Sequence, residues 1–182
     1  DKGPEAANVV TYTSLINAYV KVEKPENAEG WFNRLLQDKG PEAANVVTYN
    51  SLINAYVKVE KPENAEGWFN RLLEDKGPEA ANVVTYTSLI NAYVKVEKPE
   101  KAEGWFNRLL EDKGPEAADV VTYNSLINAY VKVEKPEKAE GWFNRLLQDK
   151  GGPEAADVVT YNSLINAYVK VAKPEKAEGW FN

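Results

Sequence analysis

The sequence predicts an all-α protein, an α-solenoid of tandem helix-turn-helix repeats. Two observations support this fold class. The chain repeats itself, because its five tryptophans lie 37, 37, 37 and 38 residues apart, at Trp31, Trp68, Trp105, Trp142 and Trp180. Each copy also contains two apolar stripes with helical spacing, separated by a Lys-Pro step. A helix pair cannot bury both stripes alone, so copies are expected to stack on their neighbours.

The 182 residues are expected to form a single repeat array, since every aromatic residue and proline belongs to the repeat. Residues 1–8 match the end of a preceding repeat. Full repeats are expected at 9–45, 46–82, 83–119 and 120–157, followed by a partial repeat at 158–182.

The first helix of each repeat is predicted from its apolar spacing. In the first copy, Tyr12, Ile16 and Tyr19 follow i, i+4 and i+7, which predicts a helix over about residues 11–22. Asn8 stands before this segment and is a candidate N-cap. The same cap role is open to the last residue of each later unit.

The second helix is predicted to begin at Pro25, because proline suits a first helical turn and ends the segment before it. Phe32 and Leu35 continue an apolar stripe. Gly40 is expected to supply a left-handed stop. Gly30, in the middle of the helix, is expected to permit the close approach of a neighbouring helix.

Two polar positions vary between otherwise constant copies. One lies inside the first helix: Thr13, Asn50, Thr87, Asn124 and Asn162. The other is the last residue of each unit: Asn45, Asn82, Asp119 and Asp157. In chain order the pairs are Thr/Asn, Asn/Asn, Thr/Asp and Asn/Asp, so all four combinations occur once. A tolerated surface position does not explain this independent variation, although it remains an alternative.

A valine precedes the variable helix residue on the same side of the helix, and a lysine follows it. The valines are Val10, Val47, Val84, Val121 and Val159. The lysines are Lys21, Lys58, Lys95, Lys132 and Lys170. Stacked repeats would align the lysines in a basic stripe that suits a phosphate backbone. A solvated face and packing between repeats are the alternatives.

The run Val-Val-Thr-Tyr-Asn-Ser-Leu-Ile-Asn-Ala-Tyr, followed by Ala-Glu-Gly-Trp-Phe-Asn-Arg-Leu-Leu, resembles the pentatricopeptide repeat family. The resemblance implies a right-handed superhelix that binds single-stranded RNA, one base per repeat. It implies that residues of the Thr13 and Asn45 types together select the base. It also implies that the Val10 type packs against the base and that the Lys21 type lies toward the phosphates.

Hydrogen-bonding chemistry predicts which base each pair prefers. Asp only accepts hydrogen bonds at neutral pH, which favours guanine or uracil with their imino N–H, whereas Asn suits adenine or cytosine. Thr leaves room for a purine and Asn reaches toward a pyrimidine. The chain order then predicts 5′-A-(C/U)-G-U-3′, because the family's Asn/Asn pair also accepts uracil. Asn162 has no closing partner in this sequence.

The unit is longer than the family's by one residue near the end of the second helix and one in the connection that follows. Ala44 stands where the family often has proline. The extra length is either absorbed before Asn45 or displaces it from its partner, and the sequence leaves both outcomes open.

Composition limits the other functions. The net charge of −6 opposes non-specific nucleic-acid binding, and the absence of cysteine and histidine removes disulfides, the usual zinc ligand and the usual general base. We therefore expect no cofactor, no metal and no enzyme activity. No apolar run reaches the roughly 18 residues of a membrane helix, so no membrane partner is expected.

Two rival interpretations remain, a tetratricopeptide-like scaffold that binds a peptide and an inert consensus scaffold. A peptide binder would vary Asn17 and Lys21, yet both are constant across copies. The near identity of the repeats indicates a consensus-designed array. Most natural members of the family are found in mitochondria and chloroplasts, but for a designed array this predicts no cellular location. Uncapped repeat faces predict end-to-end self-association.

Overall fold

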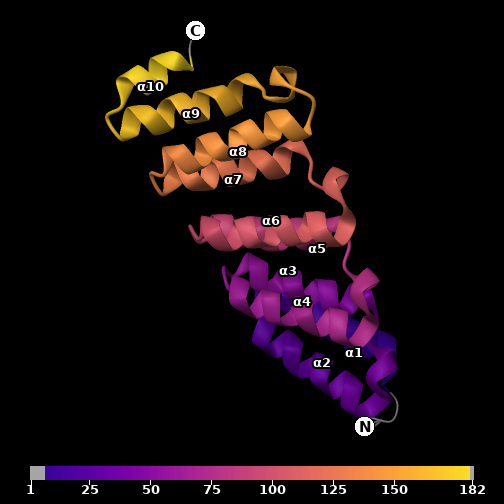
Figure 1. Ribbon diagram of the computed structural model, residues 1–182. Coiled ribbons are helices and arrows are strands. Elements are labelled where there is room, and N and C mark those ends of the chain that lie inside the picture. The colour runs from indigo at the N-terminus through magenta and orange to yellow at the C-terminus, as the bar shows by residue number, and fades with distance from the viewer. Residues whose placement is uncertain (1–6, 181–182) are drawn as a thin grey trace. The chain divides into compact units, whose positions relative to one another are not determined.

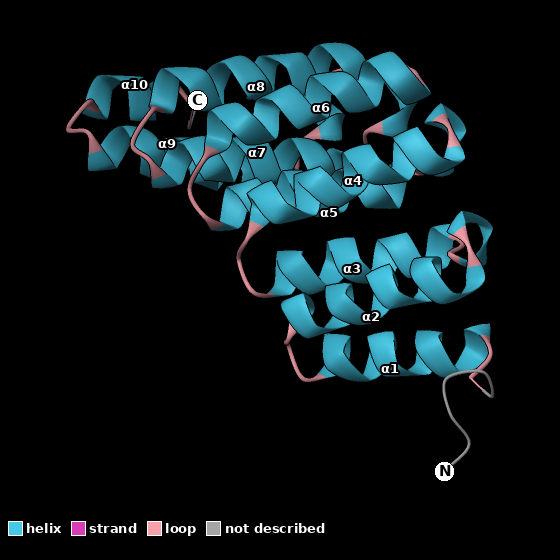
Figure 2. Ribbon diagram, turned by 90° about the horizontal axis from the view of Figure 1, so that it is seen from below, coloured by secondary structure: helices cyan, strands magenta, loops and turns pink. Residues whose placement is uncertain are grey.

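Helices joined by short connections build the part of the chain that the computed structural model describes, residues 7–180 (Figures 1 and 2). No strand occurs within that range. Residues 1–6 and 181–182 lie outside it, and they include most of the expected repeat tail at 1–8. The chain divides into two compact units, the first ending at residue 92 and the second beginning at residue 93, inside helix α5.

Both units consist of helix pairs in tandem. The first contains α1 (Val9–Lys21), α2 (Pro25–Lys39), α3 (Val46–Lys58), α4 (Pro62–Lys76) and most of α5 (Val83–Lys95), with short 3-10 turns at Pro41–Ala43 and Pro78–Ala80. The second contains α6 (Pro99–Lys113), α7 (Val120–Lys132), α8 (Pro136–Asp149), α9 (Val158–Lys170) and α10 (Pro174–Gly179), with 3-10 turns at Pro115–Ala117 and Pro153–Ala155. Helix α1 packs against α2 and α3, and α7 packs against α8 and α9. The predicted α-solenoid of helix-turn-helix repeats is therefore confirmed.

A polar side chain caps the start of each first helix. The Oδ1 atom of Asn8 accepts a hydrogen bond from the backbone N–H of Thr11 at 3.0 Å, which confirms the predicted cap. Because this cap directly precedes Val9, the two valines form the first helical turn. Helix α1 therefore begins two residues earlier than the predicted 11–22 span and ends at Lys21.

Two residues after its last lysine, the first helix of each repeat is followed by a left-handed residue that is not glycine. These residues have φ between 54° and 58° and are Glu23, Glu60, Glu97, Glu134 and Ala172. Around Glu60, its own N–H donates to Val57 and the N–H of Lys61 donates to Tyr56, both to backbone carbonyls. This is the Schellman arrangement that usually contains glycine. By contrast, Gly40 has φ 88° and ψ 166°, so it has the expected positive φ but an extended rather than a helical left-handed backbone.

Aromatic rings join each repeat to the next. Phe32 of α2 lies edge-on to Tyr49 of α3, with ring centroids 4.9 Å apart, and edge-on to Trp68 of α4 at 4.8 Å. In the second unit Phe106 contacts Tyr123 and Trp142 in the same way, each at 4.8 Å. All these side chains are buried. The predicted apolar stripes thus bury each other between neighbouring repeats.

The mid-helix glycines do not bring helices together, so that prediction was wrong. A Cβ atom added to any of them would meet nothing within 4 Å, at Gly30, Gly67, Gly104 or Gly141. The reason lies in the helical spacing. Gly30 is two residues from both Ala28 and Phe32, which are fully buried, and positions two apart point to different sides of a helix. The glycine therefore lies on the exposed side.

Candidate nucleic-acid interface

One valine of every first helix stays in solvent. The exposed fraction of these side chains is 66–69% at Val10, Val47, Val84, Val121 and Val159. They are therefore not used for packing between repeats. A single exposed valine is common on a protein surface, but the same position exposed on the successive first helices of a unit forms an apolar row within that unit.

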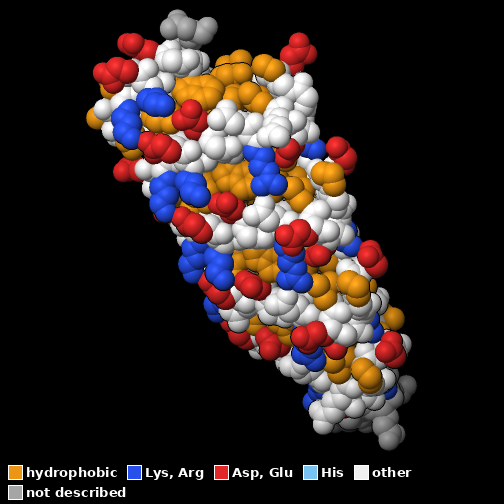
Figure 3. All heavy atoms as spheres, viewed as in Figure 1, with side chains coloured by type: hydrophobic (Ala, Val, Ile, Leu, Met, Phe, Trp, Pro, Cys, Tyr) orange, Lys and Arg blue, Asp and Glu red, His pale blue; other side chains and the backbone are white. Residues whose placement is uncertain are grey.

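The last residue of every first helix is an exposed lysine. Among the described residues, no carboxylate forms an ion pair with four of them: Lys21, Lys58, Lys132 and Lys170. Other lysines are engaged, since Lys61 pairs with Glu26 and Lys135 with Glu100 of the preceding repeat, each at 2.5 Å. Elsewhere both signs of charge alternate, as on the face in Figure 3. The four lysines are therefore available to an external anion.

The variable threonines bond to their own helix. The hydroxyl of Thr13 donates to the carbonyl of Val9, and that of Thr87 donates to the carbonyl of Val83, both at 2.9 Å. A hydroxyl has one proton and two lone pairs. Because the proton is used within the helix, these threonines offer only acceptor lone pairs to a ligand.

The variable asparagines bond to the next repeat instead. The Oδ1 atom of Asn50 accepts from the hydroxyl of Thr85 at 3.3 Å, and Oδ1 of Asn124 accepts from the hydroxyl of Thr160 at 2.9 Å. Within the described residues, the amide nitrogens make no hydrogen bond. These asparagines therefore offer N–H donors, the opposite polarity to the threonines. Asn162 is exposed and forms no such bond in the described part of the chain.

The last residue of each repeat, here called the closing residue, caps the first helix of the next repeat. In Asn45 and Asn82 the Oδ1 atom accepts from the backbone N–H of a threonine three residues later, at 3.0 Å. In Asp119 and Asp157 the equivalent bond is 2.8 Å long. One oxygen is thus used by the cap in every case. What remains for a ligand is an NH₂ donor in the asparagines and the Oδ2 acceptor in the aspartates.

Hydrogen bonds keep the two aspartates ionised. The Thr122 hydroxyl, which donates to Asp119, holds the pKa of that carboxyl below its usual value. The backbone N–H of Thr160 chiefly lowers the pKa of Asp157 in the same way. At neutral pH both side chains are therefore acceptors only.

A shared threonine brings the variable and closing residues together. The Thr85 hydroxyl contacts Asn50 at 3.3 Å and Asn82 at 3.1 Å, although these two residues are far apart in sequence. The longer unit therefore does not separate these two residues. In the second unit, Thr160 joins Asn124 and Asp157 at 2.9 and 2.8 Å.

Sequence reasoning missed these threonines because they do not vary between copies. They are the buried polar residues of the described chain, 2–5% exposed: Thr48, Thr85, Thr122 and Thr160. A threonine inside an apolar helix stripe, three residues after an Asn or Asp cap, was the available signal. Thr48 and Thr122 bond only to the closing residue, because the preceding variable residue is a threonine.

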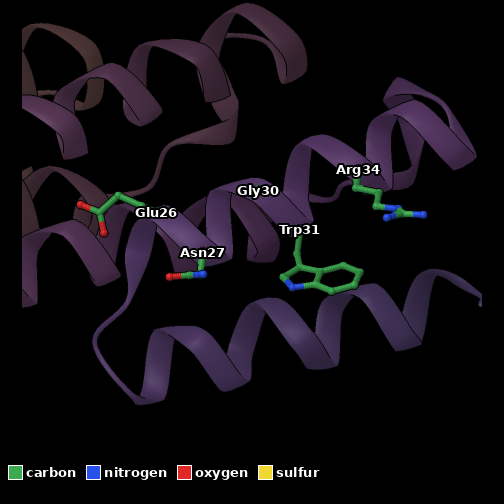
Figure 4. A pocket seen from close by; sticks show the side chains of 5 residues that line it. All are labelled: Glu26, Asn27, Gly30, Trp31 and Arg34. Carbon is green, nitrogen blue, oxygen red and sulfur yellow. The ribbon is translucent and has the colours of Figure 1, made fainter.

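A shallow hollow lies over α2 and is lined by Glu26, Asn27, Gly30, Trp31 and Arg34 (Figure 4). Its carboxylate, Glu26, pairs with Lys61 at 2.5 Å. The Arg34 guanidinium lies 6.0 Å from the centre of the Trp31 ring.

Residues that could ligate a metal do not gather in groups of three or more in the described chain. In the same range, no helix has the length and apolar character needed to cross a membrane.

The stacked helix pairs, whose first helices carry the exposed valines, the unpaired lysines and the polar pairs, define a helical-repeat protein. The PPR repeat model matches residues 47–76, 84–113, 121–150 and 159–182, and the pentatricopeptide repeat domain model matches residues 6–59. The chain belongs to the pentatricopeptide repeat family.

Solved structures with this fold include the pentatricopeptide repeat protein PPR10 from maize, which is 24% identical with a TM-score of 0.80 over 96% of this chain and 24% of that one. PPR10 in complex with an 18-nt psaJ RNA element is also 24% identical, with a TM-score of 0.67 over 98% of this chain and 25% of that one. The chain therefore spans about a quarter of the length of these proteins. No curated protein sequence matches it.

Proposed function

We propose that this chain binds single-stranded RNA, one base per repeat, without catalysing a reaction. Membership of the pentatricopeptide repeat family and the fold shared with an RNA-bound PPR10 support the ligand class. The observation that carries the base preference is the polarity of the groups that the polar pairs leave unused. Bases are told apart in single-stranded RNA by donors and acceptors on their Watson–Crick edges.

The pairs that begin with threonine suit purines. Thr13 offers an acceptor and Asn45 a donor, which complement the N6 amino group and the N1 acceptor of adenine. Thr87 and Asp119 each offer an acceptor, which complement the N2 amino group and N1–H of guanine. Threonine is also the shorter residue and leaves room for the larger base.

The pairs that begin with asparagine suit pyrimidines. Asn50 and Asn82 both offer donors, which complement the O2 and N3 acceptors of cytosine and, less selectively, the carbonyls of uracil. Asn124 offers a donor and Asp157 an acceptor, which complement O4 and N3–H of uracil. The chain order then gives 5′-A-(C/U)-G-U-3′.

The remaining parts of the face supply affinity. The exposed valines pack against the bases, a contact of the stacking type worth roughly 1–3 kcal/mol per base. The lysines lie toward the phosphates and make binding depend on salt. Because four bases are read and the strand must be ordered, the net affinity is modest.

A competition assay at low salt tests this proposal. A labelled RNA with A-C-G-U is displaced by RNAs that differ from it at one base and by a scrambled RNA. Each wrong base should weaken binding by about 5- to 150-fold. Equal competition by the scrambled RNA would reject base selection, and failure to bind the labelled RNA at all would favour the inert or the peptide-binding scaffold.

A salt titration tests the phosphate contacts separately. Replacing one unpaired lysine, for example Lys58→Gln, should reduce the slope of log K against log salt by about 0.7. Lys61→Gln is the matched control, because Lys61 is already paired with Glu26. Equal slope changes in the two variants would contradict the assignment of Lys58 to the phosphates.

A further inference from the structure

We infer that Thr85 and Thr160 are specificity-determining positioning residues, whose hydroxyls orient the asparagine of the preceding repeat so that its amino group faces the RNA. This inference rests on the proposed function and concerns the same face. The two threonines touch no base themselves. They act through Asn50 and Asn124.

We call the contacts of one threonine hydroxyl with the variable asparagine and the closing residue the clamp, and the clamp recurs in both compact units. Thr85 is 5% exposed and its hydroxyl lies 3.3 Å from Oδ1 of Asn50 and 3.1 Å from Oδ1 of Asn82. Thr160 is 2% exposed and lies 2.9 Å from Oδ1 of Asn124. Because a hydroxyl has one proton, that proton is shared between the Oδ1 atom of the variable asparagine and the cap oxygen of the closing residue, in a three-centre hydrogen bond.

The clamp matters because an asparagine amide is ambiguous. The torsion that rotates the amide has a broad, roughly two-fold preference, so a free asparagine presents its oxygen or its nitrogen with similar ease. With the oxygen held by Thr85, Asn50 presents donors only. Without the clamp, Asn50 could also present an acceptor, as Thr13 does in the adenine pair.

The chain contains its own control. Thr48 occupies the position equivalent to Thr85 and makes the same two bonds to its cap residue, through its backbone N–H and its hydroxyl, both at 3.0 Å. It has no asparagine to clamp, because the Thr13 hydroxyl bonds to Val9 instead. Replacing Thr48 or Thr85 by valine therefore removes the same cap bond, and only the second change removes a clamp.

The test compares Thr85→Val, Thr85→Ser and Thr48→Val in competition assays. Thr85→Val should reduce the preference for cytosine over adenine at the second base by about fivefold, the scale of one net hydrogen bond. Thr85→Ser should restore it, because serine keeps the hydroxyl. Thr48→Val should leave the adenine preference at the first base unchanged, while its thermal midpoint falls about as much as that of Thr85→Val.

The outcomes separate the two proposals. If the parent discriminates at the second base and Thr85→Val discriminates equally well, the clamp is overturned. If Thr48→Val loses selectivity at the first base to the same extent, the threonines act only through stability and the clamp is also overturned. If the parent shows no selectivity at any base, the proposed function itself fails.

A measurement without RNA tests the clamp even then. The side-chain amide resonances of Asn50 should shift in the NMR spectrum of Thr85→Val and stay unchanged in Thr48→Val. Unchanged Asn50 resonances in Thr85→Val would show that the hydroxyl does not hold this amide, and would overturn the inference independently of binding.

Discussion

The substitution Asn45→Asp should change the first base from adenine to guanine without harming the fold. It converts the pair Thr13/Asn45 into the Thr/Asp combination that the chain already uses in its third repeat. The helix cap should survive, because Asp119 and Asp157 make the equivalent bond at 2.8 Å. Asp and Asn cap about equally well, and the helix dipole adds about 0.3–1 kcal/mol for the charged form. The free energy of unfolding should therefore stay the same or rise slightly.

The size of the switch follows from the groups that remain after capping. In the parent, N1–H of guanine would face the NH₂ group of Asn45, two donors without an acceptor, and in the variant N1 of adenine would face the carboxylate Oδ2. An unpaired group of this kind costs about 1–3 kcal/mol. Guanine binding should therefore strengthen, and adenine binding weaken, each by about 5- to 150-fold.

The assay is competition between RNAs that differ only at the first base, measured for the parent and the variant at one salt concentration. Asn82→Asp is the matched control, since it changes the same type of residue in the next repeat and should alter only the second base, toward uracil. Retention of adenine preference by Asn45→Asp would refute the reasoning, as would a switch at any base other than the first.

Three further predictions concern stability. Gly67→Ala should stabilise the protein by about 1 kcal/mol, seen as a higher urea midpoint, because a Cβ there meets nothing within 4 Å and Gly is the poorer helix former; an unchanged or lower midpoint would contradict the exposed position. Glu134→Gly should stabilise by about 0.5–1 kcal/mol, the left-handed strain of Glu less the entropy cost of Gly, and a destabilised variant would argue against the φ of 57°. Burial, followed by the hydrogen bonds to Glu29 and Glu103, raises the pKa of Tyr56 and Tyr130 in the folded state. The stability that the two protonated tyrosines contribute to the fold is intact below their unfolded pKa of about 10 and is lost as the pH rises through their folded pKa. Urea midpoints should therefore fall above about pH 10. A flat profile of urea midpoint against pH in that range would contradict the raised pKa values.

The sequence was sufficient for features that rest on residue type and spacing. The start of α2 at Pro25 and the cap by Asn8 follow from the chemistry of proline and asparagine, and both are confirmed. The apolar stripes also face one another as the helical period predicted, with Tyr49 and Phe32 in contact. Such features depend on a few neighbouring residues and are therefore visible in a single copy.

Other features depend on contacts that no local pattern records. Glu23 adopts a left-handed backbone although its residue type disfavours it, because the Schellman hydrogen bonds outweigh its preference. The prediction for Gly30 was wrong because the sequence alone does not show whether a glycine within a helix faces a neighbouring helix or the solvent. The link from Thr85 to Asn50 joins two repeats, and its partner can be identified only once the repeats are stacked.

The shared threonine also determines where one recognition module ends. Asn82 closes one repeat, yet it caps α5, and the hydroxyl that holds it and Asn50 belongs to Thr85 in the next copy. Because this threonine is the same in every copy, a following repeat supplies the hydroxyl wherever residues 46–82 are placed in an array. A unit used as the last repeat of an assembled array should instead be extended through Thr85, so that its proposed base-selecting group stays complete.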